Sequence, residues 1–161
     1  MYLLREEASA LVRQLRTTCE MDAVEVVVCP SYTALAAVAD ALRGSRIGLG
    51  AQDLFWEPQG AFTGEVSGRM LADAGCRYVI IGHSERRTLF GETDDTVRRK
   101  LGAARQHGLQ PIVCIGETLA QREAGQTFEV LPRQLEGALA ELAPADAESL
   151  ILAYEPVWAI G

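Results

Sequence analysis

The sequence contains no asparagine, a single lysine (Lys100) and two histidines, and these shortages exclude several functions. Without asparagine there is no N-glycosylation site. Two histidines and four scattered cysteines do not give the ligand spacing of a zinc site. The net charge is −7 and the chain has no strongly basic run, so binding to nucleic acid or an anionic membrane is not expected.

Long apolar runs are also missing, which argues against a membrane protein. No stretch approaches the length of a membrane span, and the N-terminus becomes charged too early for a signal peptide. A chain of 161 residues with 48% hydrophobic residues can build one core without disulfides. We therefore expect a single cytoplasmic domain over residues 1–161. Its thiols are expected to be reduced and buried: Cys19, Cys29, Cys76 and Cys114.

Five short runs rich in Val, Ile, Leu and Ala predict strands. They are continuously apolar, which is typical of a sheet covered on both faces. Their starts lie about 23 to 40 residues apart, which leaves room for a crossover helix each time and predicts a parallel sheet. The runs are Val24–Cys29, Ile47–Ala51, Tyr78–Gly82, Gln110–Cys114 and Leu150–Tyr154.

The segments between these runs predict amphipathic helices. Residues 2–19 follow helical spacing. One later helix is expected to be capped by Ser67 and ended by Gly75, and another to be capped by Thr93 or Asp94.

Two details disturb the pattern. Pro132 inside Phe128–Glu141 predicts that this helix starts late or kinks. The array also opens on a helix and stops directly after a strand, so we expect the chain to be a fragment.

A parallel sheet of this kind fits either a doubly wound fold or part of an eight-stranded barrel, and the periodicity does not decide between them. In both folds the chemistry lies past the carboxyl ends of the strands. No glycine-rich dinucleotide fingerprint follows the first strand. The groups at the predicted strand ends are Pro30-Ser31, Gln52-Asp53, His83-Ser84-Glu85, Gly116-Glu117 and Glu155.

His83 and Glu155 are the candidates for acid–base chemistry. His83 ends an apolar run and precedes a stretch that could begin a helical turn, whose dipole disfavours protonation of the ring. Glu155 ends another apolar run and precedes Pro156, where partial desolvation would strengthen it as a base. The alternatives are a structural histidine and a solvated loop glutamate. His107, beside Gly108, resembles a helix end and receives no function.

The segment Gln52–Val66 is long for a connection in a compact domain and carries Phe55, Trp56 and Phe62. Long ordered loops are usually functional, and exposed aromatic residues favour a partner surface. We expect an interface here, and the alternative is a loop packed on itself.

Four stretches together resemble the triosephosphate isomerase family. Tyr78–Arg87 is similar to its strand-four signature, and Ala153–Gly161 to its strand-six glutamate and the start of its lid. Gly60–Ser67 is similar to the tip of its third loop, and Pro111–Leu119 to its fifth strand. The stretches occur in the family's order, and the resemblance covers essentially the whole chain.

The resemblance implies a (β/α)8 barrel, incomplete here with about five strands of eight. It implies interconversion of dihydroxyacetone phosphate and glyceraldehyde 3-phosphate in glycolysis and gluconeogenesis. Glu155 would be the base and His83 the neutral electrophile, while Glu85 would support the site without touching substrate. The main-chain N–H of Gly161 would contact the substrate phosphate. No metal or organic cofactor is implied.

The resemblance also implies a homodimer in which Thr63 and Glu65 reach the second subunit. The chain differs from the family at the first strand, where the family has an asparagine and a lysine that hold the substrate. This chain has no asparagine, and Lys100 falls in a predicted helix. We therefore expect the isolated chain to be inactive.

Two other readings remain. An aldolase-like barrel would need a Schiff-base lysine at a strand end, and the sequence has none there. A non-catalytic product or an interaction module using residues 52–67 is the alternative from another class.

Overall fold

The computed structural model describes residues 2–19 and 23–159. Five parallel strands form one sheet in the order β1-β2-β3-β4-β5, which confirms the predicted strands and their direction. The strands are β1 (Val27–Val28), β2 (Gly48–Ala51), β3 (Tyr78–Ile81), β4 (Gln110–Ile115) and β5 (Ile151–Tyr154).

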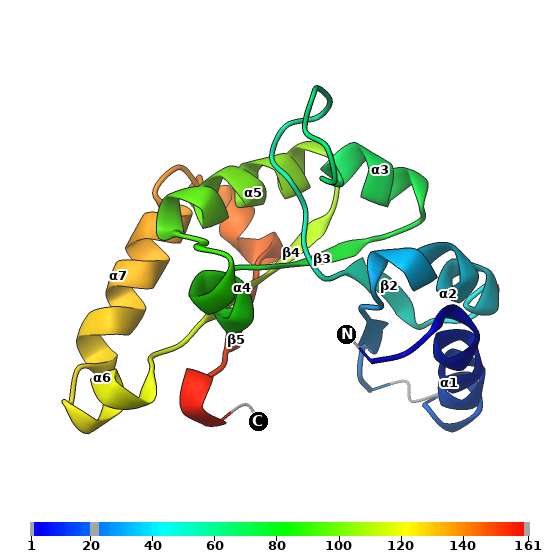
Figure 1. Ribbon diagram of the computed structural model, residues 1–161, viewed down its shortest axis with the longest axis horizontal. Coiled ribbons are helices and arrows are strands. Elements are labelled where there is room, and N and C mark those ends of the chain that lie inside the picture. The colour runs from blue at the N-terminus through cyan, green and yellow to red at the C-terminus, as the bar shows by residue number, and fades with distance from the viewer. Residues whose placement is uncertain (1, 20–22, 160–161) are drawn as a thin grey trace.

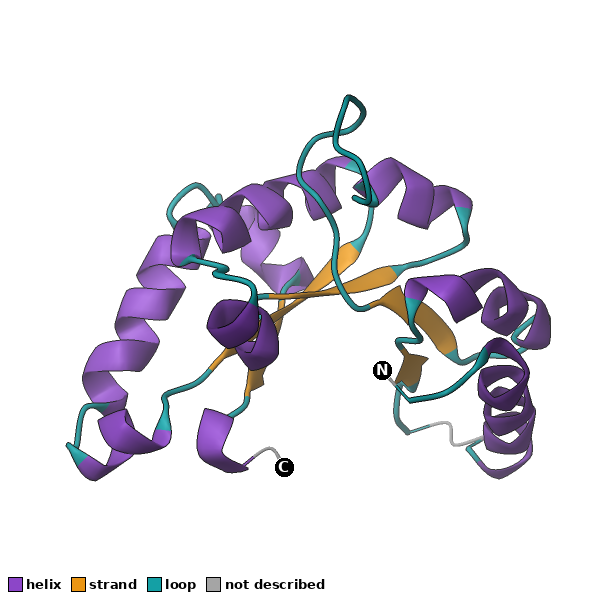
Figure 2. Cartoon of the chain, in the orientation of Figure 1, coloured by secondary structure: helices purple, strands orange, loops and turns teal. Residues whose placement is uncertain are grey.

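The helices lie mostly around the outside of an arch of strands, while α4 lies beneath the arch in the view of Figure 1. The long connection between β2 and α3 projects from the body of the molecule (Figure 2). The α-helices are α1 (Arg5–Thr18), α2 (Leu35–Ala41), α3 (Gly68–Asp73), α4 (Ser84–Leu89), α5 (Asp94–Gln106), α6 (Leu119–Glu123) and α7 (Thr127–Leu139). Short 3-10 helices cover Tyr32–Ala34, Pro144–Ser149 and Val157–Ala159.

The first strand is shorter than the predicted Val24–Cys29. Only Val27 and Val28 pair with β2, opposite Gly48 and Leu49. In the described part of the chain β1 has a neighbour on one side only. The residues at both ends of Val24–Cys29 therefore lack hydrogen bonds to a second neighbouring strand, which would hold a central strand in place.

One apolar core joins the strands to the helices that cover them. Its most buried side chains come from the strands, from α2, α3, α5 and α7 and from the start of the long loop, which explains why the strand sequences are continuously apolar. They include Leu49, Leu54, Leu71, Val79, Ile81, Val97 and Val113.

Local signals set the ends of the helices. The Ser67 hydroxyl accepts a hydrogen bond from the Met70 N–H at the start of α3 (3.3 Å), and the Thr93 hydroxyl accepts one from the Thr96 N–H at the start of α5 (3.3 Å). Both predicted caps are therefore confirmed.

The expectation of a late start for the helix around Pro132 is wrong, because α7 begins at Thr127 and contains the proline. Pro132 lies beyond the first turn of α7, so its missing N–H removes one intrahelical hydrogen bond that another residue would donate there.

None of the helices within residues 2–19 and 23–159 combines the length and apolar content needed to cross a bilayer. In the same ranges no group of three or more His, Cys, Asp or Glu side chains is arranged to hold a metal ion.

Candidate active site

His83 lies two residues past the carboxyl end of β3 and is the N-cap of α4. Its Nδ1 accepts a hydrogen bond from the main-chain N–H of Glu85 at 3.3 Å. A neutral imidazole has one N–H donor and one acceptor nitrogen. Because Nδ1 is the acceptor, the neutral ring carries its proton on Nε2. Glu85 thus contributes its main chain, while its own carboxylate is exposed.

Glu155 lies directly past the carboxyl end of β5, and its N–H donates to the Ile115 carbonyl at 2.8 Å. Its Oε2 lies 3.5 Å from His83 Nε2. This oxygen is buried and accepts no hydrogen bond from any described residue. The structure therefore brings the two predicted acid–base groups together, with an unengaged carboxylate oxygen facing an N–H donor.

Gly116, at the end of β4, permits this approach. A Cβ built on Gly116 would lie 1.9 Å from the Glu155 carbonyl oxygen, far inside van der Waals contact. The buried Gln134 of α7 holds both sides of the glycine: its Oε1 accepts from the Gly116 N–H at 2.9 Å, and its Nε2 donates to the Gly116 carbonyl at 3.0 Å. Only glycine lets the Glu155 main chain come this close.

Cys114 is buried beneath the same carboxylate. Burial, together with the negative charge of Glu155, raises the pKa of its thiol to about 12. A thiol with this pKa is neutral at physiological pH, so Cys114 is not a nucleophile here.

Glu117 anchors the segment that follows Glu155. Its fully buried carboxylate accepts hydrogen bonds from the Tyr154 hydroxyl (3.1 Å) and the Trp158 indole N–H (3.4 Å). Burial alone would raise the pKa of Glu117, but these hydrogen bonds, together with those from the main chain, hold it below its ordinary value. The Glu117 carbonyl also accepts from the Val157 N–H at 3.0 Å. The sequence marked Glu117 only as a polar group at a strand end.

A buried ionic cluster lies behind His83, and sequence reasoning missed it. Lys100 Nζ contacts Asp53 (2.6 Å) and Glu92 (3.0 Å), and the Arg86 guanidinium contacts the same two carboxylates, each at 2.9 Å. The four charges cancel, and they join the start of the long loop to α4 and α5. The available signal was that Lys100 falls on the apolar stripe of α5, beside Leu101.

The long loop of residues 52–66 is irregular apart from a bridge between Phe55 and Ser67. Its aromatic rings pack on one another, with Phe55 4.1 Å from Trp56 and 4.8 Å from Phe62 between ring centroids. Thr63 and Glu65 are exposed at its tip. The loop is therefore partly packed on itself, while its tip is free to meet a partner. The other predicted site residue, Gly161, lies outside the described residues.

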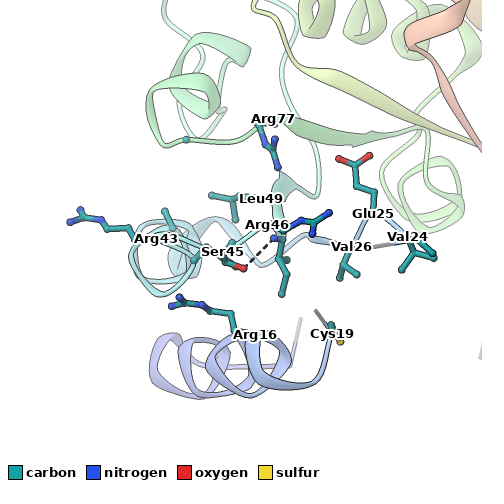
Figure 3. A pocket seen from close by; sticks show the side chains of 16 residues that line it. Arg16, Cys19, Val24, Glu25, Val26, Arg43, Ser45, Arg46, Leu49 and Arg77 are labelled. Carbon is teal, nitrogen blue, oxygen red and sulfur yellow. Dashed lines mark hydrogen bonds between the residues drawn. The ribbon is translucent and has the colours of Figure 1, made fainter. Parts of the chain in front are cut away.

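Two hollows lie at opposite ends of the strands. The smaller, of about 290 Å³, adjoins the candidate site and is lined by residues that include Gly82, Cys114, Gly116 and Glu155. The larger, of about 840 Å³, lies where β1, β2 and β3 begin and is rich in arginine (Figure 3). Among these arginines, Arg16 donates to the Ala41 carbonyl at 2.9 Å and Arg43 pairs with Asp40 at 2.7 Å.

The parallel sheet and its strand-end pair define a β/α protein with acid–base groups at the carboxyl rim. Comparison with known proteins narrows this class. The family model described as triosephosphate isomerase matches residues 1–161. A triosephosphate isomerase from Moorella thermoacetica is 60% identical over 161 residues, covering all of this chain and 65% of the relative. One from Symbiobacterium thermophilum is 62% identical over 141 residues, covering 88% of this chain and 55% of the relative.

A crystal structure of triosephosphate isomerase from Bartonella henselae superposes with a TM-score of 0.91 at 41% identity, covering 98% of this chain and 65% of that one. The chain belongs to the triosephosphate isomerase family. Its five strands are part of a (β/α)8 barrel. The chain spans about 65% of the length of the first of these relatives.

Proposed function

We propose that the protein interconverts dihydroxyacetone phosphate and D-glyceraldehyde 3-phosphate, using Glu155 as the base and His83 as the neutral electrophile. One observation supports this most strongly: the 3.5 Å approach of His83 Nε2 to the unbonded Oε2 of Glu155. The name of the family supports the choice of substrate. No metal or organic cofactor enters the proposed reaction.

The chemistry follows from the two groups. Glu155 takes a proton from the carbon beside the substrate carbonyl and returns it to the neighbouring carbon. The Nε2–H of His83 donates to the carbonyl oxygen while negative charge develops there, and the ring then moves protons between the two oxygens of the enediol. The hydrogen bond from the Glu85 N–H to Nδ1 favours the required tautomer. Glu85 is thus proposed to support the site, and Gly161 to contact the phosphate.

The test removes the base in the protein expressed from its complete coding sequence. Glu155→Gln keeps the size of the side chain but cannot accept the proton, so kcat should fall by about 10²–10⁴-fold. Glu129→Gln, the same change on the exposed first turn of α7, is the matched control and should leave kcat unchanged. A coupled isomerase assay measures both variants. A Glu155→Gln variant that keeps more than half of the wild-type kcat would contradict the mechanism.

We also propose a homodimer formed through the tip of the loop of residues 52–66. Its support is the exposure of Phe62, Thr63 and Glu65 on a loop whose base is fixed by packed aromatic rings. Replacing residues 62–64 with a short polar turn should give monomers with low activity. Light scattering that shows an unchanged dimer mass would refute this role of the loop.

A further inference from the structure

The orientation of His83 depends on the two peptide groups that flank it. The first peptide joins Gly82 to His83, and Gly82 has a positive φ of 74°. A Cβ on Gly82 would lie 3.0 Å from the Val97 side chain and 3.2 Å from the Cys114 carbonyl oxygen, so this turn is tightly enclosed. Whatever fixes these peptides fixes the direction in which the imidazole leaves the main chain.

Arg87 contacts both peptides. Its side-chain Nε donates to the Gly82 carbonyl at 2.8 Å, on the amino side of His83. Its main-chain N–H donates to the His83 carbonyl at 3.1 Å, on the carboxyl side. Glu92 holds the preceding peptide, which joins Ile81 to Gly82, because its Oε1 accepts from the Gly82 N–H at 3.1 Å.

The Arg87 guanidinium is itself fixed to a rigid element. Its Nη1 pairs with Asp94, the first residue of α5, at 2.6 Å. Asp94 in turn lies against α7, because a Cβ on Gly137 would come within 2.7 Å of the Asp94 Cβ. The side chain thus links the peptide before His83 to two packed helices.

One nitrogen of Arg87 is left unsatisfied. Nη2 is buried and donates no hydrogen bond to a described residue, and it lies 3.1 Å from the place of a Gly82 Cβ. An unpaired buried polar atom costs free energy and calls for an explanation. Here the planar guanidinium must meet the Gly82 carbonyl and the Asp94 carboxylate at once, and this arrangement leaves Nη2 without a partner.

We infer that Arg87 is a positioning residue for the proposed isomerase reaction: it orients His83 so that Nε2 faces Glu155. This inference rests on the proposed function. Arg87 itself need not touch substrate. Its charge-assisted hydrogen bond is stronger than a neutral one, and an error of about 1 Å in the placement of a reacting group can cost about 10²-fold in rate.

The experiment compares Arg87→Met with Arg105→Met in the protein expressed from its complete coding sequence. Arg105 also pairs with an aspartate, Asp146 at 2.5 Å, but on a distant part of α5. Arg87→Met should lower kcat about 100-fold with KM changed less than about threefold, while Arg105→Met leaves both parameters unchanged. An Arg87→Met kcat within threefold of wild type overturns the inference. The inference is also overturned if Arg87→Met and Arg105→Met lose activity and melting temperature to the same extent.

A second readout does not depend on turnover. In ¹⁵N NMR spectra, assigned with His83→Gln, neutral His83 should hold its proton on Nε2 in the wild type and become a mixture of tautomers in Arg87→Met. If Arg87→Met does not fold, Arg87→Lys takes its place, because lysine can reach the carbonyl or Asp94 but cannot span both. Wild-type kcat and an unchanged tautomer in Arg87→Lys would overturn the inference. If the wild-type protein shows no isomerase turnover, only the proposed function is refuted. The NMR measurement of the His83 tautomer still tests whether Arg87 positions the ring.

Discussion

Replacing Gly116 by alanine tests how closely the strand carrying Glu155 must approach β4. The added Cβ would lie 1.9 Å from the Glu155 carbonyl oxygen and 2.7 Å from the carbonyl carbon. These are main-chain atoms, so no rotamer change can relieve the contact. To reach an ordinary separation of 3.4 Å, the two strand ends must move apart by about 1.5 Å.

That displacement acts on stability and on catalysis. Overpacking a well-packed interior costs about 1–3 kcal/mol, and the higher end applies because the contact is between main chains. The Gln134 hydrogen bonds to Gly116 would be strained as well. Since Glu155 moves with its main chain, kcat should fall by about 10²-fold or more.

Gly102→Ala is the matched control. Gly102 lies within α5, and its added methyl group would meet no atom within 4 Å. Alanine is the better helix former, so this variant should gain about 0.5–1 kcal/mol. Urea unfolding measures the stability of both variants, and the coupled isomerase assay measures kcat. A Gly116→Ala protein as stable and as active as Gly102→Ala would refute the close approach of β4 and the Glu155 main chain.

Two further predictions concern buried charges. Glu117→Gln should lower the melting temperature near neutral pH. The folded pKa of Glu117 lies below its ordinary value of 4.5, so its stabilisation is present above that value and is lost as the pH falls through the folded pKa. The difference from wild type should therefore shrink in acid, and an equal difference at about pH 7 and about pH 3 would contradict it. Lys100→Met should cost about 3–5 kcal/mol in urea unfolding, nearer the lower figure because Arg86 still pairs with both carboxylates. Arg43→Met, which breaks an exposed ion pair, should cost under about 1 kcal/mol, and equal losses in the two variants would refute the role of burial.

The sequence predicted most of the architecture, because the deciding signals are local. Continuous apolar runs marked each strand, and hydroxyl side chains at Ser67 and Thr93 marked helix starts that the structure confirms. The extent of β1 was overestimated, because an apolar run does not tell how much of it finds a partner strand. The expected late start of the helix around Pro132 is wrong, because a helix can include a proline at the loss of one main-chain hydrogen bond.

The supporting side chains could not be predicted, because their contacts join distant segments. Lys100 looked like an ordinary helix residue until α5 was placed against the start of the long loop, where it meets Asp53. Likewise, Gln134 carries no local sign that it will hold both sides of Gly116. A polar residue on the buried face of a helix indicates a buried polar contact, but it does not indicate which residue it will contact.

The register of the sheet sets which strand-end groups can meet. Ile81 pairs with Val113 across β3 and β4, and Tyr154 pairs with Ile115 across β4 and β5. His83, two residues past Ile81, therefore lies level with Ile115, and Glu155, one past Tyr154, lies level with the glycine at 116. That glycine has no side chain to separate the two groups. A slip of one residue in the pairing of β5 would turn Glu155 to the opposite face of the sheet. The proposed proton transfer at this rim thus depends on strand pairing as much as on the identity of the two residues.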